Sequence, residues 1–170
     1  HADSYDDITS LVLVQRWPLR TWFSLSERAL YQAERLEKTI DKNPQDIMFV
    51  RSQAELKTYL ERRATEPQLV GALLGTEGSH ALDGELENVQ RFYDAGFRMM
   101  SLQHFFDNRL GGSLHGVSGA GLTDFGRAVV RQIEELNIIL DLSHSSEAVV
   151  RDVLSICLLY TSDAADDSGC

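Results

Sequence analysis

The stretch TDFGRAVVRQIEELNIILDLSHSSEAVVRDVL, residues 123–154, decides the fold. Its apolar spacing predicts a helix over 123–136, a short apolar strand over 138–142 and a second helix over 146–154. Thr123 and Asp124 suit a helix start, because a hydroxyl cap and an early acid both stabilise a helix N-terminus. The stretch is therefore typical of a repeating strand and helix unit.

The same alternation extends toward the N-terminus. We expect helices over 24–42, 52–63 and 83–95, with Ser26 as the N-cap of the first, and strands over 47–50, 68–74 and 98–102. Continuous apolar strands that alternate with helices are typical of a parallel sheet buried on both faces. The sequence therefore predicts an α/β fold.

Composition limits the classes of function. The 170 residues are 43% hydrophobic and 25% charged, which is ordinary for one soluble globular domain. The formal net charge is -10, so we expect no nucleic-acid partner. No run is apolar enough for a transmembrane segment and no signal peptide is visible, which leaves the compartment open. The only cysteines are Cys157 and Cys170, so the body of the chain has no disulfide framework.

Polar residues follow three predicted strands at their carboxyl ends, where parallel α/β proteins carry their chemistry. Glu77 follows the strand over 68–74, His104 the strand over 98–102, and His144 the strand over 138–142. Each has an ordinary alternative, namely a solvated loop acid, a packed core histidine and a helix-entry residue. Their shared position favours a common site, because barrel metallohydrolases assemble a site from separate strand ends.

Three further positions carry histidine. His1 and Asp3 are two residues apart and could form a bidentate pair for a metal such as zinc, although a frayed terminus is an alternative. His80 has a weaker claim, as a supporting or capping residue. His115 lies in a long loop with five glycines between residues 105 and 121, and a mobile loop position is its simplest interpretation.

Five motifs resemble, in order and approximate spacing, those of the membrane (renal) dipeptidase family of zinc-dependent metallohydrolases. They are HAD at 1–3, GTEGSHAL at 75–82, SLQHFFDN at 101–108, GLTDFGRAVV at 121–130 and DLSHS at 141–145. The resemblance covers nearly all of residues 1–155. It implies a (β/α)8 TIM barrel of the metal-dependent hydrolase type, of which residues 1–156 would supply about the first five β/α units.

The resemblance also implies the site. Two Zn²⁺ ions would be bridged by Glu77, with His1 and Asp3 on one ion and His144 on the other. His104 would contact the substrate and polarise the scissile carbonyl, and Asn108 in the same motif would help to bind the substrate. The family's second histidine on the latter zinc, its substrate-carboxylate arginine and its proton-shuttling aspartate match no segment here.

The implied reaction is hydrolysis of a dipeptide substrate by a metal-bridging hydroxide. The resemblance leaves open whether the intact protein is a homodimer. Another barrel amidohydrolase, acting on a cyclic amide or lactone, and a non-catalytic metal- or peptide-binding barrel are the alternatives. Residues 157–166, CLLYTSDAAD, resemble a translated transposon-type sequencing adapter. We therefore expect 157–170 to be a non-native disordered tail that forms no sixth barrel strand, and the chain alone to be inactive.

Overall fold

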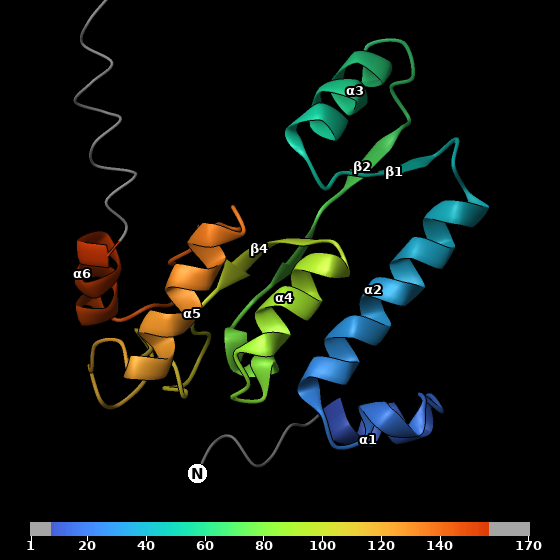
Figure 1. The fold of residues 1–170 in the computed structure, drawn as a ribbon. Coiled ribbons are helices and arrows are strands. Elements are labelled where there is room, and N and C mark those ends of the chain that lie inside the picture. Colours follow the sequence, from blue (N-terminus) through green and yellow to red (C-terminus); the bar gives the residue numbers. More distant parts are fainter. Residues whose placement is uncertain (1–7, 157–170) are drawn as a thin grey trace, which may run out of the picture.

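The computed structural model describes residues 8–156 (Figure 1). The expectations for His1, Asp3 and the tail over 157–170 lie outside these residues. The elements are α1 (Ile8–Val14), the 3-10 helix η2 (Leu19–Thr21), α2 (Leu25–Lys42), β1 (Ile47–Phe49), α3 (Gln53–Arg63), β2 (Val70–Ala72), β3 (Leu74–Thr76), the 3-10 helix η3 (Ser79–Leu82), α4 (Glu87–Asp94), β4 (Phe97–Ser101), α5 (Asp124–Glu135), β5 (Ile139–Asp141) and α6 (Glu147–Ile156).

The five strands among residues 8–156 are all paired in parallel. β1 pairs with β2, and β3, β4 and β5 form a second sheet in that order. Only Leu73 separates β2 from β3, so one extended segment contributes to both sheets. Parallel strands that alternate with helices confirm the predicted α/β fold. Within the described residues the strands do not close into a barrel.

Helix starts follow their caps. Ser52 caps α3 and Thr123 caps α5, as their hydroxyls accept hydrogen bonds from the amides of Glu55 and Gly126. The predicted cap of α2 was wrong by two residues. Ser24 has the extended backbone that an N-cap requires and accepts from the amide of Glu27, whereas Ser26 already lies in the first turn.

Two other elements differ from the prediction. The helix expected over 83–95 begins only at Glu87, because Asp83 and Gly84 have positive φ values of 54° and 78° and interrupt a right-handed helix. The expected strand over 68–74 is divided into β2 and β3. Helix α1 was not predicted.

The core lies on one side of the larger sheet, beneath α2, α4, α5 and α6 (Figure 1). Thr76, Met100 and Leu140 are in register across β3, β4 and β5, and Met100 is completely buried in this core. On α4, the Phe92 ring stacks against Phe97 of β4, with the ring centroids 5.0 Å apart. This packing fixes the position of β4 between its two neighbours.

The opposite face of the same sheet is open among the described residues. Gly75, Met99 and Ile139 are in register there, and Ile139 is 54% exposed. The expectation of a sheet buried on both faces was therefore wrong for residues 8–156. The physical reason is that the helices of the described chain cover only one face.

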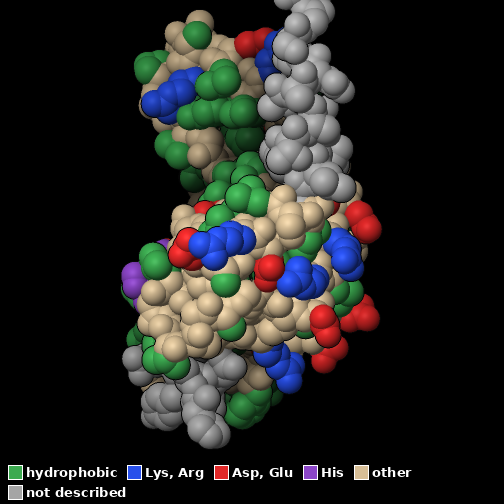
Figure 2. All heavy atoms as spheres, turned by 90° about the vertical axis from the view of Figure 1, so that its left-hand side faces the viewer, with side chains coloured by type: hydrophobic (Ala, Val, Ile, Leu, Met, Phe, Trp, Pro, Cys, Tyr) green, Lys and Arg blue, Asp and Glu red, His purple; other side chains and the backbone are tan. Residues whose placement is uncertain are grey.

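The parts of the molecule around the two sheets also differ in the side chains on their surfaces. β1, β2 and α3 form an upper lobe on which hydrophobic side chains gather, while α5 and α6 carry interspersed charges of both signs (Figure 2). No residue of α3 is buried. In the described part of the chain no helix is both long and apolar enough to cross a membrane.

Candidate metal centre

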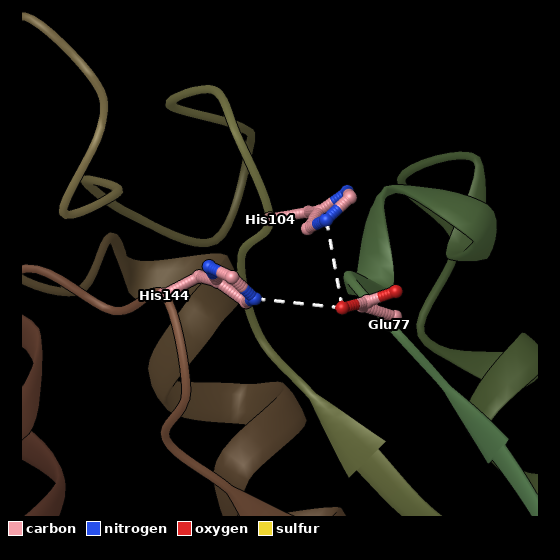
Figure 3. Close-up of side chains that lie close together, drawn as sticks. All are labelled: Glu77, His104 and His144. Atoms are coloured by element: carbon pink, nitrogen blue, oxygen red, sulfur yellow. Dashed lines mark ion pairs between the residues drawn. The ribbon is translucent and has the colours of Figure 1, made fainter.

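Three strand ends deliver Glu77, His104 and His144 to one edge of the larger sheet. Glu77 directly follows β3, and each histidine follows its strand by three residues. Because the strands are parallel, their carboxyl ends meet at the same edge. Figure 3 shows the two imidazoles and the carboxylate pointing toward one another. One ligand atom from each side chain lies within 4.8 Å of the others.

One carboxylate oxygen lies between both rings. Oε1 of Glu77 is 3.5 Å from Nε2 of His104 and 3.4 Å from Nε2 of His144 (Figure 3). The two imidazole rings lie nearly perpendicular, with centroids 4.9 Å apart. The side chain of Glu77 is 68% exposed, whereas those of His104 and His144 are 28% and 27% exposed. The carboxylate of Glu77 is therefore accessible to solvent, whereas most of the surface of each histidine side chain is covered by protein.

Backbone conformations at two positions permit this convergence. Gly78 has φ of +92°, and a Cβ there would lie 2.8 Å from Nδ1 of His80 and 3.1 Å from Cβ of His104. Only glycine adopts this conformation without strain and leaves room for the neighbouring strand end. His144 itself has φ of +65°, a left-handed conformation that is uncommon outside glycine.

Buried hydroxyls connect the backbones of the strand ends. The amide of Gly78 donates to Oγ of Ser101 at 2.6 Å, and Oγ of Ser79 donates to the Ser101 carbonyl at 2.6 Å. Ser79 and Ser101 are completely buried. Since every group in this pair of contacts is satisfied, the segment after Glu77 is fixed to the end of β4 at little cost.

The loop between His104 and α5 is organised around Asp107. Its carboxylate accepts from the amides of Ser113, Val117 and Ser118. The bond from Ser113 contributes most to lowering the pKa of Asp107 below its ordinary value, with further lowering by Ser118 and Val117. The loop is thus an ordered structure that leads from one histidine toward the other.

This loop places His115 near the three residues. The ring of His115 lies with its centroid 5.5 Å from that of His144 and 5.8 Å from that of Phe105. His115 is exposed and is not one of the three residues whose ligand atoms converge. Sequence reasoning gave it only a mobile loop position, because its approach depends on the contacts of Asp107. The length of the loop and its glycines were the available signal.

The remaining predicted residues have other surroundings. Asn108 donates to the Leu102 carbonyl at 2.7 Å and accepts from the Leu110 amide at 2.9 Å, so its side chain braces the loop. Its binding of substrate stays a prediction. His80 lies in η3 behind Gly78, outside the converging group. His1 and Asp3 fall outside the described residues, and their role as ligands also stays a prediction.

The donor set suits a borderline metal ion. Zinc in proteins is bound by imidazole nitrogen and carboxylate oxygen, often by three protein ligands at a catalytic site. Glu77, His104 and His144 offer a carboxylate oxygen and two imidazole nitrogens, and these atoms lie within 4.8 Å of one another. The residues present therefore fit such an ion.

Comparisons with known proteins agree with this chemistry. The sequence model of the membrane dipeptidase family, peptidase family M19, matches residues 11–159. Dipeptidase 3 of Mus musculus is 30% identical over 105 residues, which cover 52% of this chain and 19% of the mouse protein.

Solved structures share the fold. An amidohydrolase from Pseudomonas aeruginosa is 27% identical with a TM-score of 0.64, over 73% of this chain and 36% of that chain. A metallopeptidase from Rhodobacter sphaeroides, liganded with a phosphinate mimic of the dipeptide L-Ala-D-Ala, is 25% identical with a TM-score of 0.57, at the same coverage of 73% and 36%. The chain thus spans well under half the length of these relatives. The match to most of its residues shows that it belongs to the membrane dipeptidase family.

Proposed function

We propose that this chain carries part of the active site of a zinc-dependent dipeptidase. The observation that carries the proposal is the convergence of Glu77, His104 and His144 at one strand edge, in a member of a peptidase family. The substrate class follows from the dipeptide mimic bound by the related bacterial metallopeptidase. The proposed protein hydrolyses the amide bond of a dipeptide, within a (β/α)8 barrel to which the parallel strands contribute.

The side chains would divide the work around two ions. Glu77 would be shared between the two ions, His1 and Asp3 would hold one of them, and His144 would hold the other. A carboxylate bridge keeps two cations close in spite of their repulsion. The exposure of Glu77 and the 3.4 Å approach of its Oε1 to Nε2 of His144 support this assignment. When bound, zinc supplies a Lewis acid that lowers the pKa of a water molecule to about 7 and provides hydroxide at neutral pH.

His104 would act on the substrate. Its ring is partly exposed at the same edge and lies 4.9 Å from that of His144, so it could donate a hydrogen bond to the scissile carbonyl oxygen. Such a bond strengthens as the carbonyl gains negative charge, and therefore lowers the barrier to attack. Asn108 would assist by holding the loop that carries His104 and by contacting the dipeptide.

Zinc binding by the whole chain, followed by calorimetry, tests the metal assignment. We expect Glu77→Gln to weaken zinc binding by about 10-fold or more, because it removes the shared anionic ligand. Glu61→Gln, a change at an exposed acid of α3, should leave the affinity unchanged. Equal affinities for the two variants would overturn the assignment. Zinc binding without hydrolysis of dipeptides by a full-length relative would favour the amidohydrolase or binding-protein alternative.

We also propose that the chain alone is a poor dipeptidase. The family's second zinc histidine, carboxylate-binding arginine and proton-shuttling aspartate match no segment, and general acid-base help alone is worth about 10² to 10⁴-fold. With added zinc, turnover of L-Ala-D-Ala should be about 100-fold or more below that of a full-length relative. Turnover within about tenfold of that relative, abolished by Glu77→Gln, would contradict this expectation.

A further inference from the structure

We propose that Gln103 is a positioning residue that sets the spacing of His104 and His144 through its hydrogen bond to Ser145. The inference rests on the proposed metal site and adds a residue that positions two of its side chains. Gln103 directly precedes His104, and Ser145 directly follows His144. Oγ of Ser145 donates to Oε1 of Gln103 at 2.7 Å. One side-chain bond therefore joins the two segments that carry the histidines.

The bond is shielded from water. Gln103 is completely buried and Ser145 is 6% exposed. A hydrogen bond in such surroundings is stronger and better defined in direction than an exposed one, because water does not compete for either partner. Since each histidine is one peptide unit from a partner in this bond, the bond restrains the backbone that carries each ring.

The outer sides of the two segments are joined through the loop. Oγ of Ser113 donates to the His104 carbonyl, and the amide of Leu114 donates to the His144 carbonyl at 2.8 Å. These contacts hold the two histidine backbones from the side of the loop. The bond from Ser145 to Gln103 holds the same segments from the buried side, so the pair of rings is fixed from both directions.

Stability alone does not explain a glutamine here. Nε2 of Gln103 is buried and has no hydrogen-bond partner among residues 8–156. Burial of an unpaired polar group costs about 1 to 3 kcal/mol. Replacement of both partners by apolar side chains of similar shape would remove this cost along with the bond. The costly residue is better explained by the geometry that it maintains.

The double variant Gln103→Met/Ser145→Ala separates positioning from stability, with Thr21→Val as the control. Thr21 is also completely buried, but its hydroxyl donates to the Pro18 carbonyl before α2. The first measurement is the nuclear Overhauser effect between the rings of His104 and His144 in the metal-free protein. The second is affinity for Co²⁺, a spectroscopic substitute for zinc, with its visible absorption as the readout.

We expect the double variant to keep its melting temperature, to lose most of the ring-to-ring effect and to bind Co²⁺ about 10 to 100-fold more weakly. Thr21→Val should keep both readouts. An unchanged ring-to-ring effect and unchanged Co²⁺ affinity in the double variant would overturn the inference. If the double variant does not fold, Ser145→Ala decides by the same two readouts. Failure of the wild-type chain to bind Co²⁺ would count against the metal site, while the ring-to-ring effect would still decide the role of Gln103.

Discussion

At the scale of single residues, the site depends on a glycine that brings two strand ends together. Gly78 combines a φ of +92° with close approach to His104. Gly119 has a φ of +57°, but a Cβ added there would meet no heavy atom within 4 Å. Both glycines therefore have a positive φ, and they differ in the space around them. This difference allows strain and crowding to be separated by experiment.

We expect Gly78→Ala to lower the free energy of unfolding by about 1 to 2 kcal/mol and to weaken zinc binding. A positive φ costs a residue with a Cβ about that amount, and the added methyl would also crowd His80 and His104. Gly119→Ala should cost a similar strain energy with no loss of zinc affinity. Urea unfolding and zinc calorimetry measure both quantities. A Gly78→Ala protein with wild-type zinc affinity would show that this close approach does not position the site.

At the scale of elements, the loop over 105–121 depends on one ionised carboxylate. Asp107 has a pKa below its ordinary value, chiefly because the amide of Ser113 donates to it. A lowered folded-state pKa means that the contribution to stability is fully present above the unfolded pKa, about 3.9. It is lost as the pH falls through the lower folded pKa.

We therefore expect the amide resonances of Ser113, Val117 and Ser118 to move together in acid as the loop loosens. Asp107→Asn should show the loosened spectrum already at neutral pH, because a neutral amide is a weaker acceptor of three amide bonds. Asp46→Asn, at an exposed acid before β1, should behave as the wild type. Independent movement of the three resonances, or a wild-type spectrum for Asp107→Asn, would contradict a role for this carboxylate.

The position of His115 in this loop could not be predicted from the sequence, whereas the positions of the other site residues could. Strand ends were predictable for Glu77, His104 and His144, since apolar runs locate strands and parallel strands share an edge. The approach of His115 to His144 was not predictable, because it requires hydrogen bonds between Asp107 and amides that lie up to eleven residues away. The cap of α2 was misplaced for a related reason. Two serines at 24 and 26 are equivalent in pattern, and only backbone conformation selects Ser24.

At the scale of the whole molecule, the helices among residues 8–156 cover only one face of the larger sheet. The α/β class followed from periodicity, but the extent of burial did not, because it depends on which helices lie over which face. Helices pack on the side of Met100, while Ile139 on the other face is 54% exposed. Val70 of β2 is also 54% exposed. Exposed β-branched residues on short parallel strands favour association with other apolar surfaces.

We expect the chain to self-associate in solution and Val70→Thr/Ile139→Thr to shift it toward the monomer. Threonine keeps the β-branched shape that suits a strand but puts a hydroxyl in place of a methyl of Val70 and of the ethyl group of Ile139, so it reduces the gain from burying the surface. Leu19→Thr is the matched control, since Leu19 is 73% exposed but lies in η2, away from both sheets. Sedimentation velocity over a range of concentrations measures the association. A concentration-independent monomer for the wild type would contradict the expectation. An equal shift in Leu19→Thr would instead assign association to general surface hydrophobicity, because the two sheets would then have no special part in it.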